Sequence, residues 1–148
     1  MNEVKLILRH PKAVLPIRKT IGSSGFDICS VHDFIIGFGD IQVIDTGLDV
    51  AYIPDGFEIQ VRPRSGLALE HGITVVNSPG TIDSDYRGPI KVILSKLRKT
   101  KSPSVFTSGA RVAQLVICPV SMETPIIEVS EQTSETDRGS GGFGSTGI

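Results

Sequence analysis

The sequence has almost no net charge and very little cysteine. Its formal net charge is −1 at pH 7. Lysine and arginine are spread along the chain, which argues against a nucleic-acid-binding protein that depends on bulk charge. Cys29 and Cys118 are isolated, with no CxxC motif and no histidine at ligand spacing. Two buried free thiols are the simplest interpretation, and a disulfide between them is the alternative.

Long apolar runs are also absent. The longest ones, such as residues 115–118, are only strand-sized, so no segment is expected to span a membrane. The N-terminus has no charged region followed by a long apolar core, which argues against a secretory signal. A length of 148 residues is typical of one domain. These features predict a soluble, cytoplasmic, single-domain protein with no nucleic-acid or membrane partner.

Short apolar or alternating segments, separated by turn residues, make up most of the chain. Residues 57–61 alternate as a half-buried strand does. Residues 90–94 and 112–117 are rich in β-branched residues and predict more central strands. Further signals are a strand-like run at 4–8 and turns at 38–40, 53–56 and 78–80. This pattern predicts an all-β fold, a jelly-roll-like β-barrel.

Only one short helix is expected. Ser65 is suited to cap it, residues 67–70 to form its body and Gly72 to end it. The last stretch, residues 132–148, is rich in Gly, Ser and Thr and has one aromatic side chain. Such a segment buries too little surface to offset its ordering entropy. We therefore expect a barrel over residues 1–131 and a flexible Gly-rich tail that functions with it.

Two glycine-containing clusters lie in the first half of the chain. Residues 24–28 have the pattern of a turn that leads into a strand. In residues 62–68, Ser65 and Gly66 stand where the expected helix begins, and the free N–H groups of a helix start suit a phosphate. Arg64 adds a planar, charged fork beside them. An ordinary capped helix with a solvated arginine is the structural alternative.

Two further clusters follow. In residues 77–88, Asp83 and Asp85 can flank a bend, so that one faces a pocket as a general base while the other makes a structural bond. An Asp-rich turn is the alternative. In residues 138–147, glycines allow backbone N–H groups to approach phosphate oxygens. The single arginine there supplies charge and the single phenylalanine a face for a base, whereas a disordered Gly/Ser tail is the alternative.

Together, these clusters resemble the motifs of the trimeric dUTPase family, in the family's order and spacing. The matching segments are residues 24–30, 63–68, 80–88, 111–115 and 138–147. The resemblance extends from about residue 4 to the C-terminus. It implies a homotrimer with shared active sites that uses Mg²⁺ to hydrolyse dUTP to dUMP and pyrophosphate. Such an enzyme keeps uracil out of DNA and supplies dUMP for dTMP synthesis.

The resemblance also implies roles for individual residues in the reaction. Asp83 would be the general base that activates the water attacking the α-phosphorus. Mg²⁺ would be held mainly by the substrate phosphates, with Asp27 reaching it through water. The residues expected to bind phosphate oxygens are Arg64, Ser65, Gly66 and Gln114, together with Arg138 at the γ-phosphate.

Recognition of the nucleoside falls to other residues by the same resemblance. The expected uracil reader consists of Asn77 and the hairpin backbone at Gly80, Thr81 and Ile82. Tyr86 would lie under the deoxyribose and leave no room for a 2′-hydroxyl group. Phe143 would cover the base, and Gly144 would contact the substrate, when the tail of a neighbouring chain closes over the site.

The sequence departs from the family pattern at one position and leaves other functions open. Motif four often has an acidic residue that orients a neighbouring arginine, and Ala110 stands in its place, so how Arg64 is held stays open. The basic residues 96–101 are expected to form a solvated loop. A dCTP deaminase, which shares the fold and the trimer, is one alternative function. A non-catalytic sensor that binds dUTP is the other.

Overall fold

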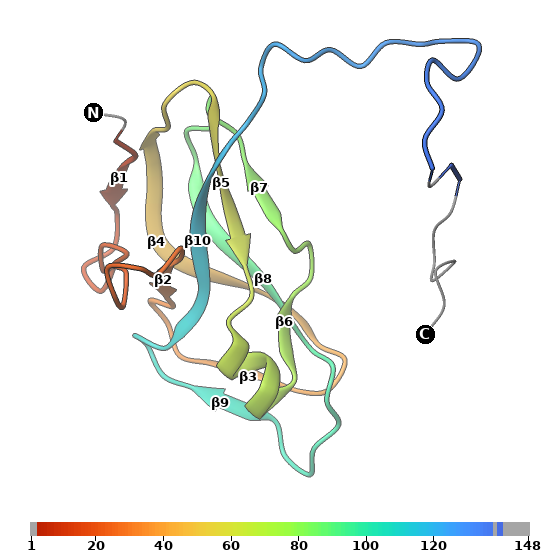
Figure 1. Cartoon of the computed structure of the whole chain (residues 1–148). Coiled ribbons are helices and arrows are strands. Elements are labelled where there is room, and N and C mark those ends of the chain that lie inside the picture. Colours follow the sequence, from red (N-terminus) through yellow and green to blue (C-terminus); the bar gives the residue numbers. More distant parts are fainter. Residues whose placement is uncertain (1–2, 138, 141–148) are drawn as a thin grey trace.

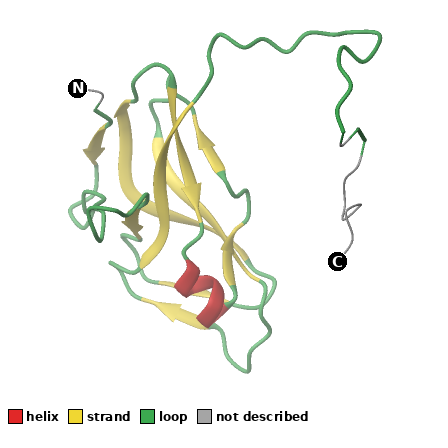
Figure 2. Cartoon of the chain, viewed as in Figure 1, coloured by secondary structure: helices red, strands yellow, loops and turns green. Residues whose placement is uncertain are grey.

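The computed structural model describes residues 3–137, 139 and 140 (Figure 1). Strands dominate this part of the chain, and its helix is the short turn η1 (Leu67–His71) (Figure 2). The strands are β1 (Lys5–Leu8), β2 (Phe26–Cys29), β3 (Phe34–Ile36), β4 (Ile41–Tyr52), β5 (Phe57–Arg62), β6 (Ile73–Val75), β7 (Gly80–Ile82), β8 (Pro89–Lys96), β9 (Ser104–Phe106) and β10 (Arg111–Pro119). The predicted all-β class with one short helix is confirmed.

The strands form two four-stranded sheets, ordered β1-β4-β8-β6 and β2-β10-β5-β7, and a small sheet of β3 and β9. All these neighbours pair antiparallel. The two larger sheets enclose one apolar core (Figure 1). It includes Ile28, Ile59 and Leu115 from one sheet and Leu48, Val92 and Leu94 from the other. Each such side chain contributes about 1.5–3 kcal/mol when fully buried, which makes this core the main source of stability.

Strand β10 is central in its sheet and determines which residues meet at the candidate site. It lies between β2 and β5, and Gln114 is opposite both Asp27 on β2 and Arg62 on β5. The central position predicted for residues 112–117 is confirmed. The central position predicted for residues 90–94 is also confirmed, because β8 lies between β4 and β6.

Strand β5 shows the predicted alternation, and β4 is an element that the sequence patterns did not indicate. Ile59 and Val61 of β5 are buried, whereas the residues between them are half-buried. Strand β4 is 12 residues long and contains Gly47 with a φ of +66°. Its pairing with β8 shifts register between Asp45 and Leu48. This bulge breaks the period-2 pattern by which a strand is found in a sequence.

The helical turn ends as predicted but begins differently. Gly72 ends η1 with a φ of +65°, a left-handed conformation that glycine adopts without steric cost. The predicted cap at Ser65 is wrong. The N–H group of Ala68 donates to the main-chain oxygen of Arg64 over 3.1 Å, so helical bonding already encloses Ser65. Gly66 has helical dihedral angles, and within the described chain no side chain caps the turn.

Lys96 at the end of β8 is buried, contrary to the solvated loop expected for residues 96–101. Its side chain is 1% exposed. The ammonium group donates to Oγ1 of Thr100 over 2.8 Å and to Oγ of Ser104 over 2.9 Å. Residues 97–101 are exposed as expected. The burial of Lys96 follows from its place in β8, whose last residues face the interior, and the loop oxygens offset the loss of water.

Beyond β10 the chain leaves the barrel. Residues 119–137 are all exposed and extend away from both sheets (Figure 1). The division into a barrel and a tail at residue 131 stays a prediction. Cys29 and Cys118 are free thiols, as expected, although they are half-buried rather than buried. Within the described ranges, no helix is long and apolar enough to cross a membrane.

Candidate functional site

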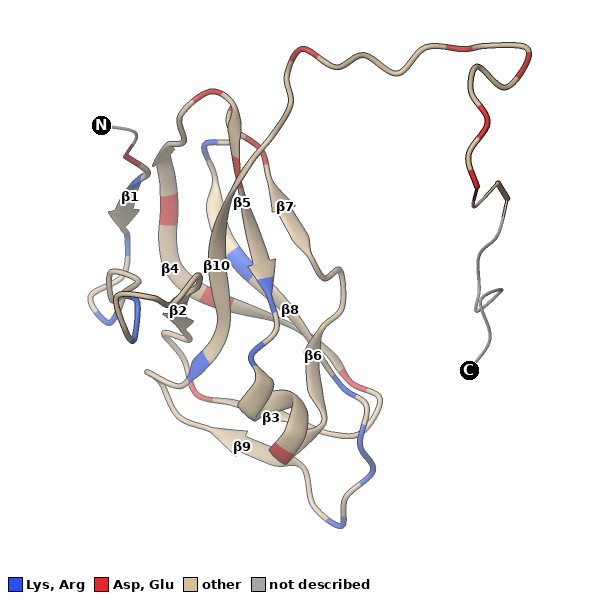
Figure 3. Cartoon of the chain, viewed as in Figure 1, with Lys and Arg blue, Asp and Glu red and all other residues tan. Residues whose placement is uncertain are grey.

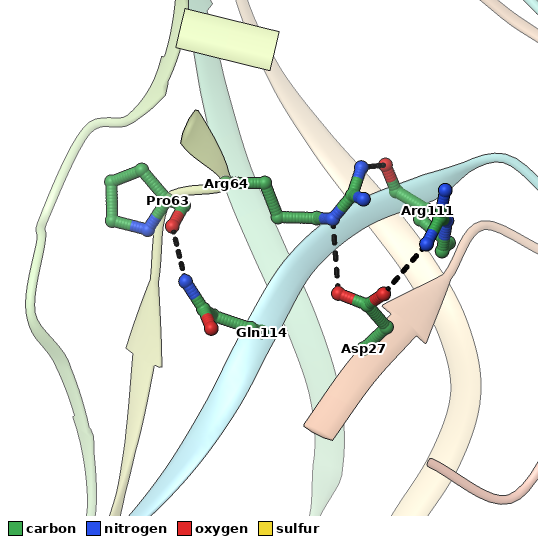
Figure 4. Close-up of polar contacts among 5 residues, drawn as sticks. All are labelled: Asp27, Pro63, Arg64, Arg111 and Gln114. Atoms are coloured by element: carbon green, nitrogen blue, oxygen red, sulfur yellow. Dashed lines mark hydrogen bonds and ion pairs between the residues drawn. The ribbon is translucent and has the colours of Figure 1, made fainter. Parts of the chain in front are cut away.

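An aspartate on β2 joins two arginines from other parts of the chain (Figure 4). Nε of Arg64, two residues after β5, donates to Oδ1 of Asp27 over 3.0 Å. Nη1 of Arg111, the first residue of β10, donates to Oδ2 of the same carboxylate over 3.0 Å. Nη1 of Arg64 also donates to the main-chain oxygen of Arg111 over 3.2 Å. The pairing of β10 with both β2 and β5 brings these residues together.

This cluster carries an excess of positive charge, because two guanidinium groups share one carboxylate. The side chains of Arg64 and Asp27 are 21% and 23% exposed, whereas that of Arg111 is 48% exposed. Partial burial reduces screening by water, so the Arg64–Asp27 pair is stronger than a fully exposed ion pair. Basic side chains elsewhere are distributed around the barrel (Figure 3). The excess charge of the cluster suits an anionic ligand.

Cys29 lies beside this cluster, in register with Arg111 on β10. Burial raises the pKa of the Cys29 thiol, and the Asp27 carboxylate raises it further, against smaller opposing effects of the two arginines. A raised pKa keeps the thiol protonated at neutral pH. Cys29 is therefore a poor nucleophile.

The side chain of Gln114 is held by a bond to the main chain and by the space that glycine leaves at position 25. Its Nε2 donates to the main-chain oxygen of Pro63 over 2.9 Å (Figure 4). A Cβ atom on Gly25 would lie 2.0 Å from Oε1 of Gln114, closer than any real contact. Gly25 is thus required for the position that Gln114 takes next to Arg64.

A depression of about 510 Å³ collects three of the predicted phosphate-binding residues: Arg64, Ser65 and Gln114. The fourth, Gly66, follows Ser65 at the start of η1. The other residues that line this depression come from β5 and the residue after it, from η1 and from the segment before β7: Gln60, Arg62, Pro63, Ala68, Ser78 and Pro79. These four predicted phosphate-binding residues therefore lie in one continuous region of the folded chain.

Arg62 is a cationic lining residue that the sequence analysis did not single out. Its Nε and Nη2 donate to Oε1 of Gln60 over 2.9 and 2.6 Å, which fixes the guanidinium against the sheet. The alternation of β5 was a sufficient signal, because it puts Glu58, Gln60 and Arg62 on one face.

The hairpin after β7 forms a second depression, of about 440 Å³, lined by Thr81, Ile82, Asp83 and Tyr86 among others. Asp83 is exposed at the end of β7. The N–H group of Tyr86 donates to the main-chain oxygen of Asp83 over 3.1 Å, which closes the turn. The hydroxyl group of Tyr86 donates to the main-chain oxygen of Pro89 over 3.0 Å. Tyr86 is thereby held in the same depression as Asp83.

Asn77 lies against the first residue of this hairpin. A Cβ atom on Gly80 would lie 3.0 Å from Nδ2 of Asn77 and 3.4 Å from Cβ of Val61. Gly80 is buried, and Asn77 is exposed. The residues predicted to read uracil, Asn77, Gly80, Thr81 and Ile82, therefore lie together, and the last three pair with β5 as strand β7.

Within one chain, Asp83 and the phosphate site lie at opposite ends of β5. Gly80 pairs with Val61 and Ile82 with Ile59, so Asp83 comes level with Glu58. At about 3.3 Å per residue, the strand from there to Arg62 alone spans about 13 Å. The two depressions share no lining residue. A single described chain thus does not bring Asp83 to the phosphate site.

Three predicted site residues, Arg138, Phe143 and Gly144, lie outside the described residues, so their roles stay predictions. The role of Asp27 as a water-mediated Mg²⁺ ligand also stays a prediction. Among the described residues, no group of three or more His, Cys, Asp or Glu side chains is arranged to hold a metal ion.

Comparison with known proteins gives consistent matches. The sequence model of the dUTPase family matches residues 11–147. A deoxyuridine 5′-triphosphate nucleotidohydrolase of Wolinella succinogenes is 49% identical over 145 residues, which cover 98% of this chain and 94% of that protein. A protein of the same name from Roseobacter denitrificans is 52% identical over 136 residues, which cover 90% of this chain and 86% of that protein.

Solved structures have the same fold. The dUTPase of Staphylococcus bacteriophage 80alpha with dUPNHPP has a TM-score of 0.86 and 25% identity, over 100% of both chains. A dUTPase mutant from the S. aureus phage phi11, described as coordinating a structural Mg(II) ion, has a TM-score of 0.80 at 22% identity. That alignment covers 90% of this chain and 100% of the phage chain. The predicted jelly-roll-like barrel is confirmed.

Proposed function

The chain belongs to the dUTPase family, and on this premise we propose that it hydrolyses dUTP to dUMP and pyrophosphate. The observation that best supports the proposal is the Arg64–Asp27–Arg111 cluster beside a depression that also contains Ser65 and Gln114. Charge-assisted hydrogen bonds from such groups match the oxygens of a triphosphate. The enzyme would act in the cytoplasm, where it keeps uracil out of DNA and supplies dUMP for dTMP synthesis.

Phosphate binding would fall to Arg64, Ser65, Gly66 and Gln114. Arg64 uses Nε and one Nη1 bond within the protein. Its Nη2 group has no partner among the described residues and is available to a phosphate oxygen. Arg64 and Gln114 are held by bonds within the protein, so they would stabilise charge on the leaving pyrophosphate with little reorganisation.

Asp83 would act as the general base. Its carboxylate would take a proton from a water molecule as the water oxygen bonds to the α-phosphorus. The bond from that phosphorus to the bridging oxygen breaks, and pyrophosphate leaves with the electron pair. The exposed position of Asp83 in the hairpin depression supports this role, because a base needs access to substrate.

Specificity would come from the hairpin. Asn77 and the backbone of Gly80, Thr81 and Ile82 would bond the uracil edge, and a cytosine edge would leave buried groups unpaired. A tight hairpin would exclude the methyl group of thymine. Tyr86, whose hydroxyl is already bonded to Pro89, would present its ring to the deoxyribose and exclude a 2′-hydroxyl group.

The proposed reaction uses Mg²⁺. The Asp27 carboxylate fits an ion that is held mainly by the substrate phosphates and contacts the protein through water. Each oxygen of Asp27 accepts one arginine bond, and a carboxylate oxygen can accept a second bond from a metal-bound water. Asp27 would therefore hold the ion through water, in keeping with the strong hydration of Mg²⁺. When bound, the ion would offset the charge of the phosphates.

We further propose a homotrimer with shared sites. The separation of Asp83 from Arg64 along β5 supports this, because both are needed at one substrate. Exposed apolar side chains on the barrel, such as Ile41 and Val43 of β4, provide surface for self-association. Arg138, Phe143 and Gly144 would reach the site from a neighbouring chain and close over the nucleotide.

Turnover of four nucleotides tests the proposed function. The purified protein with Mg²⁺ should release pyrophosphate from dUTP and leave dCTP, dTTP and UTP largely intact. Ammonia release from dCTP would instead identify a deaminase. Binding of dUTP without turnover would identify a sensor.

A further inference from the structure

Arg111 contacts Arg64 by two routes that the proposed mechanism leaves unused. Its side chain binds Oδ2 of Asp27 over 3.0 Å, while Oδ1 of Asp27 binds Arg64 (Figure 4). Its main-chain oxygen accepts a bond from Nη1 of Arg64 over 3.2 Å. Arg111 is therefore bonded to Arg64 directly through its main-chain oxygen, and linked to it indirectly through the Asp27 carboxylate.

The Asp27 carboxylate could compete with a phosphate for the N–H groups of Arg64, and the bond from Arg111 limits this competition. A carboxylate and a guanidinium prefer a bidentate arrangement with two parallel bonds. If both oxygens of Asp27 turned to Arg64, they would compete with the phosphate for its N–H groups. With Oδ2 directed to Arg111, Asp27 binds Arg64 through Nε alone. The Nη2 group of Arg64 then stays available.

Arg111 also changes the charge that a phosphate meets. Asp27 alone would cancel the charge of Arg64 at close range, and the second guanidinium restores an excess of positive charge. Although Ala110 provides no carboxylate, Arg64 is held by the carboxylate of Asp27 on β2.

We infer that Arg111 is a positioning residue for triphosphate binding, which acts through Asp27 by keeping that carboxylate from neutralising Arg64. This inference rests on the proposed function. It differs from a direct contact between Arg111 and phosphate, because it requires the Asp27 carboxylate. A purely structural role of Arg111 would affect the binding of every ligand, whereas the proposed role affects only ligands that carry phosphates and not the nucleoside.

A double-mutant cycle on binding tests the inference. The dissociation constants of dUTP and of deoxyuridine would be measured in EDTA, for the full-length wild type, Arg111→Gln, Asp27→Asn and the double variant. Arg111→Gln should weaken dUTP binding roughly 10-fold, the value of one charge-assisted bond, and leave deoxyuridine binding unchanged. In the Asp27→Asn background the same substitution should weaken dUTP binding markedly less, because only the direct charge effect of Arg111 is then lost.

Arg9→Gln is the matched control, because Arg9 also pairs with an aspartate, Asp49, over 3.0 Å, at an exposed site away from both depressions. It should bind both ligands like the wild type. An equal effect of Arg111→Gln in both backgrounds would overturn the inference in favour of direct phosphate contact. An equal loss for deoxyuridine would overturn it in favour of a structural role.

Arg111→Lys provides a second variant if Arg111→Gln does not fold. Lysine keeps the charge and one bond to Asp27, so dUTP binding should stay within about 3-fold of the wild type. A loss as large as that expected for glutamine would contradict the inference. Failure of the proposed function is recognised separately, since the wild type would then release no pyrophosphate from dUTP.

Discussion

Arg64 donates through Nε to Oδ1 of Asp27 over 3.0 Å, and this bond joins two segments that are 37 residues apart in the sequence. The segment around Asp27 and the segment around Arg64 each have an ordinary structural interpretation on their own. Joined, they make a fixed guanidinium at the edge of a depression that Gln114 completes. The proposed phosphate site thus depends on three strands that meet, β2, β5 and β10.

Asp83→Asn separates binding from chemistry. The variant should bind dUTP with an affinity close to that of the wild type, because the phosphate-binding groups are untouched. Its turnover should fall roughly 10²–10⁴-fold, as for loss of a general base. Pyrophosphate release and equilibrium binding of dUTP measure the two effects. Turnover close to that of the wild type would remove Asp83 from the mechanism.

Gly25→Ala should disturb the phosphate site through Gln114. The added Cβ would lie 2.0 Å from Oε1 of Gln114 and force this side chain away from Pro63. We expect an unfolding free energy lower by about 1 kcal/mol, the value of one hydrogen bond, and weaker dUTP binding.

The control for this substitution is Gly22→Ala, because a Cβ atom there meets nothing within 4 Å. Denaturant unfolding and dUTP titration of both variants give the comparison. Equal behaviour of the two variants would mean that Gln114 does not need the space at Gly25.

Lys96→Met should lower stability without altering the site. The substitution removes the donor shared by Thr100 and Ser104, and leaves the oxygen of the half-buried Ser104 without this bond. We expect a loss of about 2 kcal/mol in unfolding free energy, and unchanged kcat/KM well below the melting temperature.

Lys99→Met is its matched control, since Lys99 is exposed. Thermal and denaturant unfolding of the two variants measure the difference. If Lys96→Met proves as stable as Lys99→Met, the buried ammonium group contributes nothing to the fold.

Removal of residues 138–148 tests the proposed tail. The truncated chain should keep the fold, because both sheets and the core lie before residue 120. Its turnover should be poor, because Arg138 and Phe143 would be missing when the nucleotide binds. Circular dichroism and pyrophosphate release distinguish the cases. An unfolded product would show that the tail is structural, and full activity would remove it from the mechanism.

Local patterns predicted the elements that obey a simple period. Residues 57–61 alternate and form β5, and Gly72 ends the helical turn. The patterns failed where the backbone departs from a regular period, as in β4 with its bulge near Gly47. They also failed at Ser65, because the first helical bond reaches back to Arg64.

Contacts between distant segments were beyond the reach of sequence patterns. The bond of Asp27 to Arg64, the place of Arg111 in the cluster and the burial of Lys96 depend on strand register and sheet order. None of these leaves a periodic signal in the chain. The same is true of the separation between Asp83 and Arg64, which follows from the pairing of β7 with β5.

The central claim is that Asp83 of one copy acts on a nucleotide bound by Arg64 of another. Co-expression of Asp83→Asn and Arg64→Gln chains with different tags allows mixed assemblies to be purified and their dUTP turnover measured. If the two groups come from different chains of a trimer, one of the three sites in each purified mixed assembly has both intact, and activity should return to about a third of that of the wild type. Mixed assemblies no more active than either variant alone would contradict the claim.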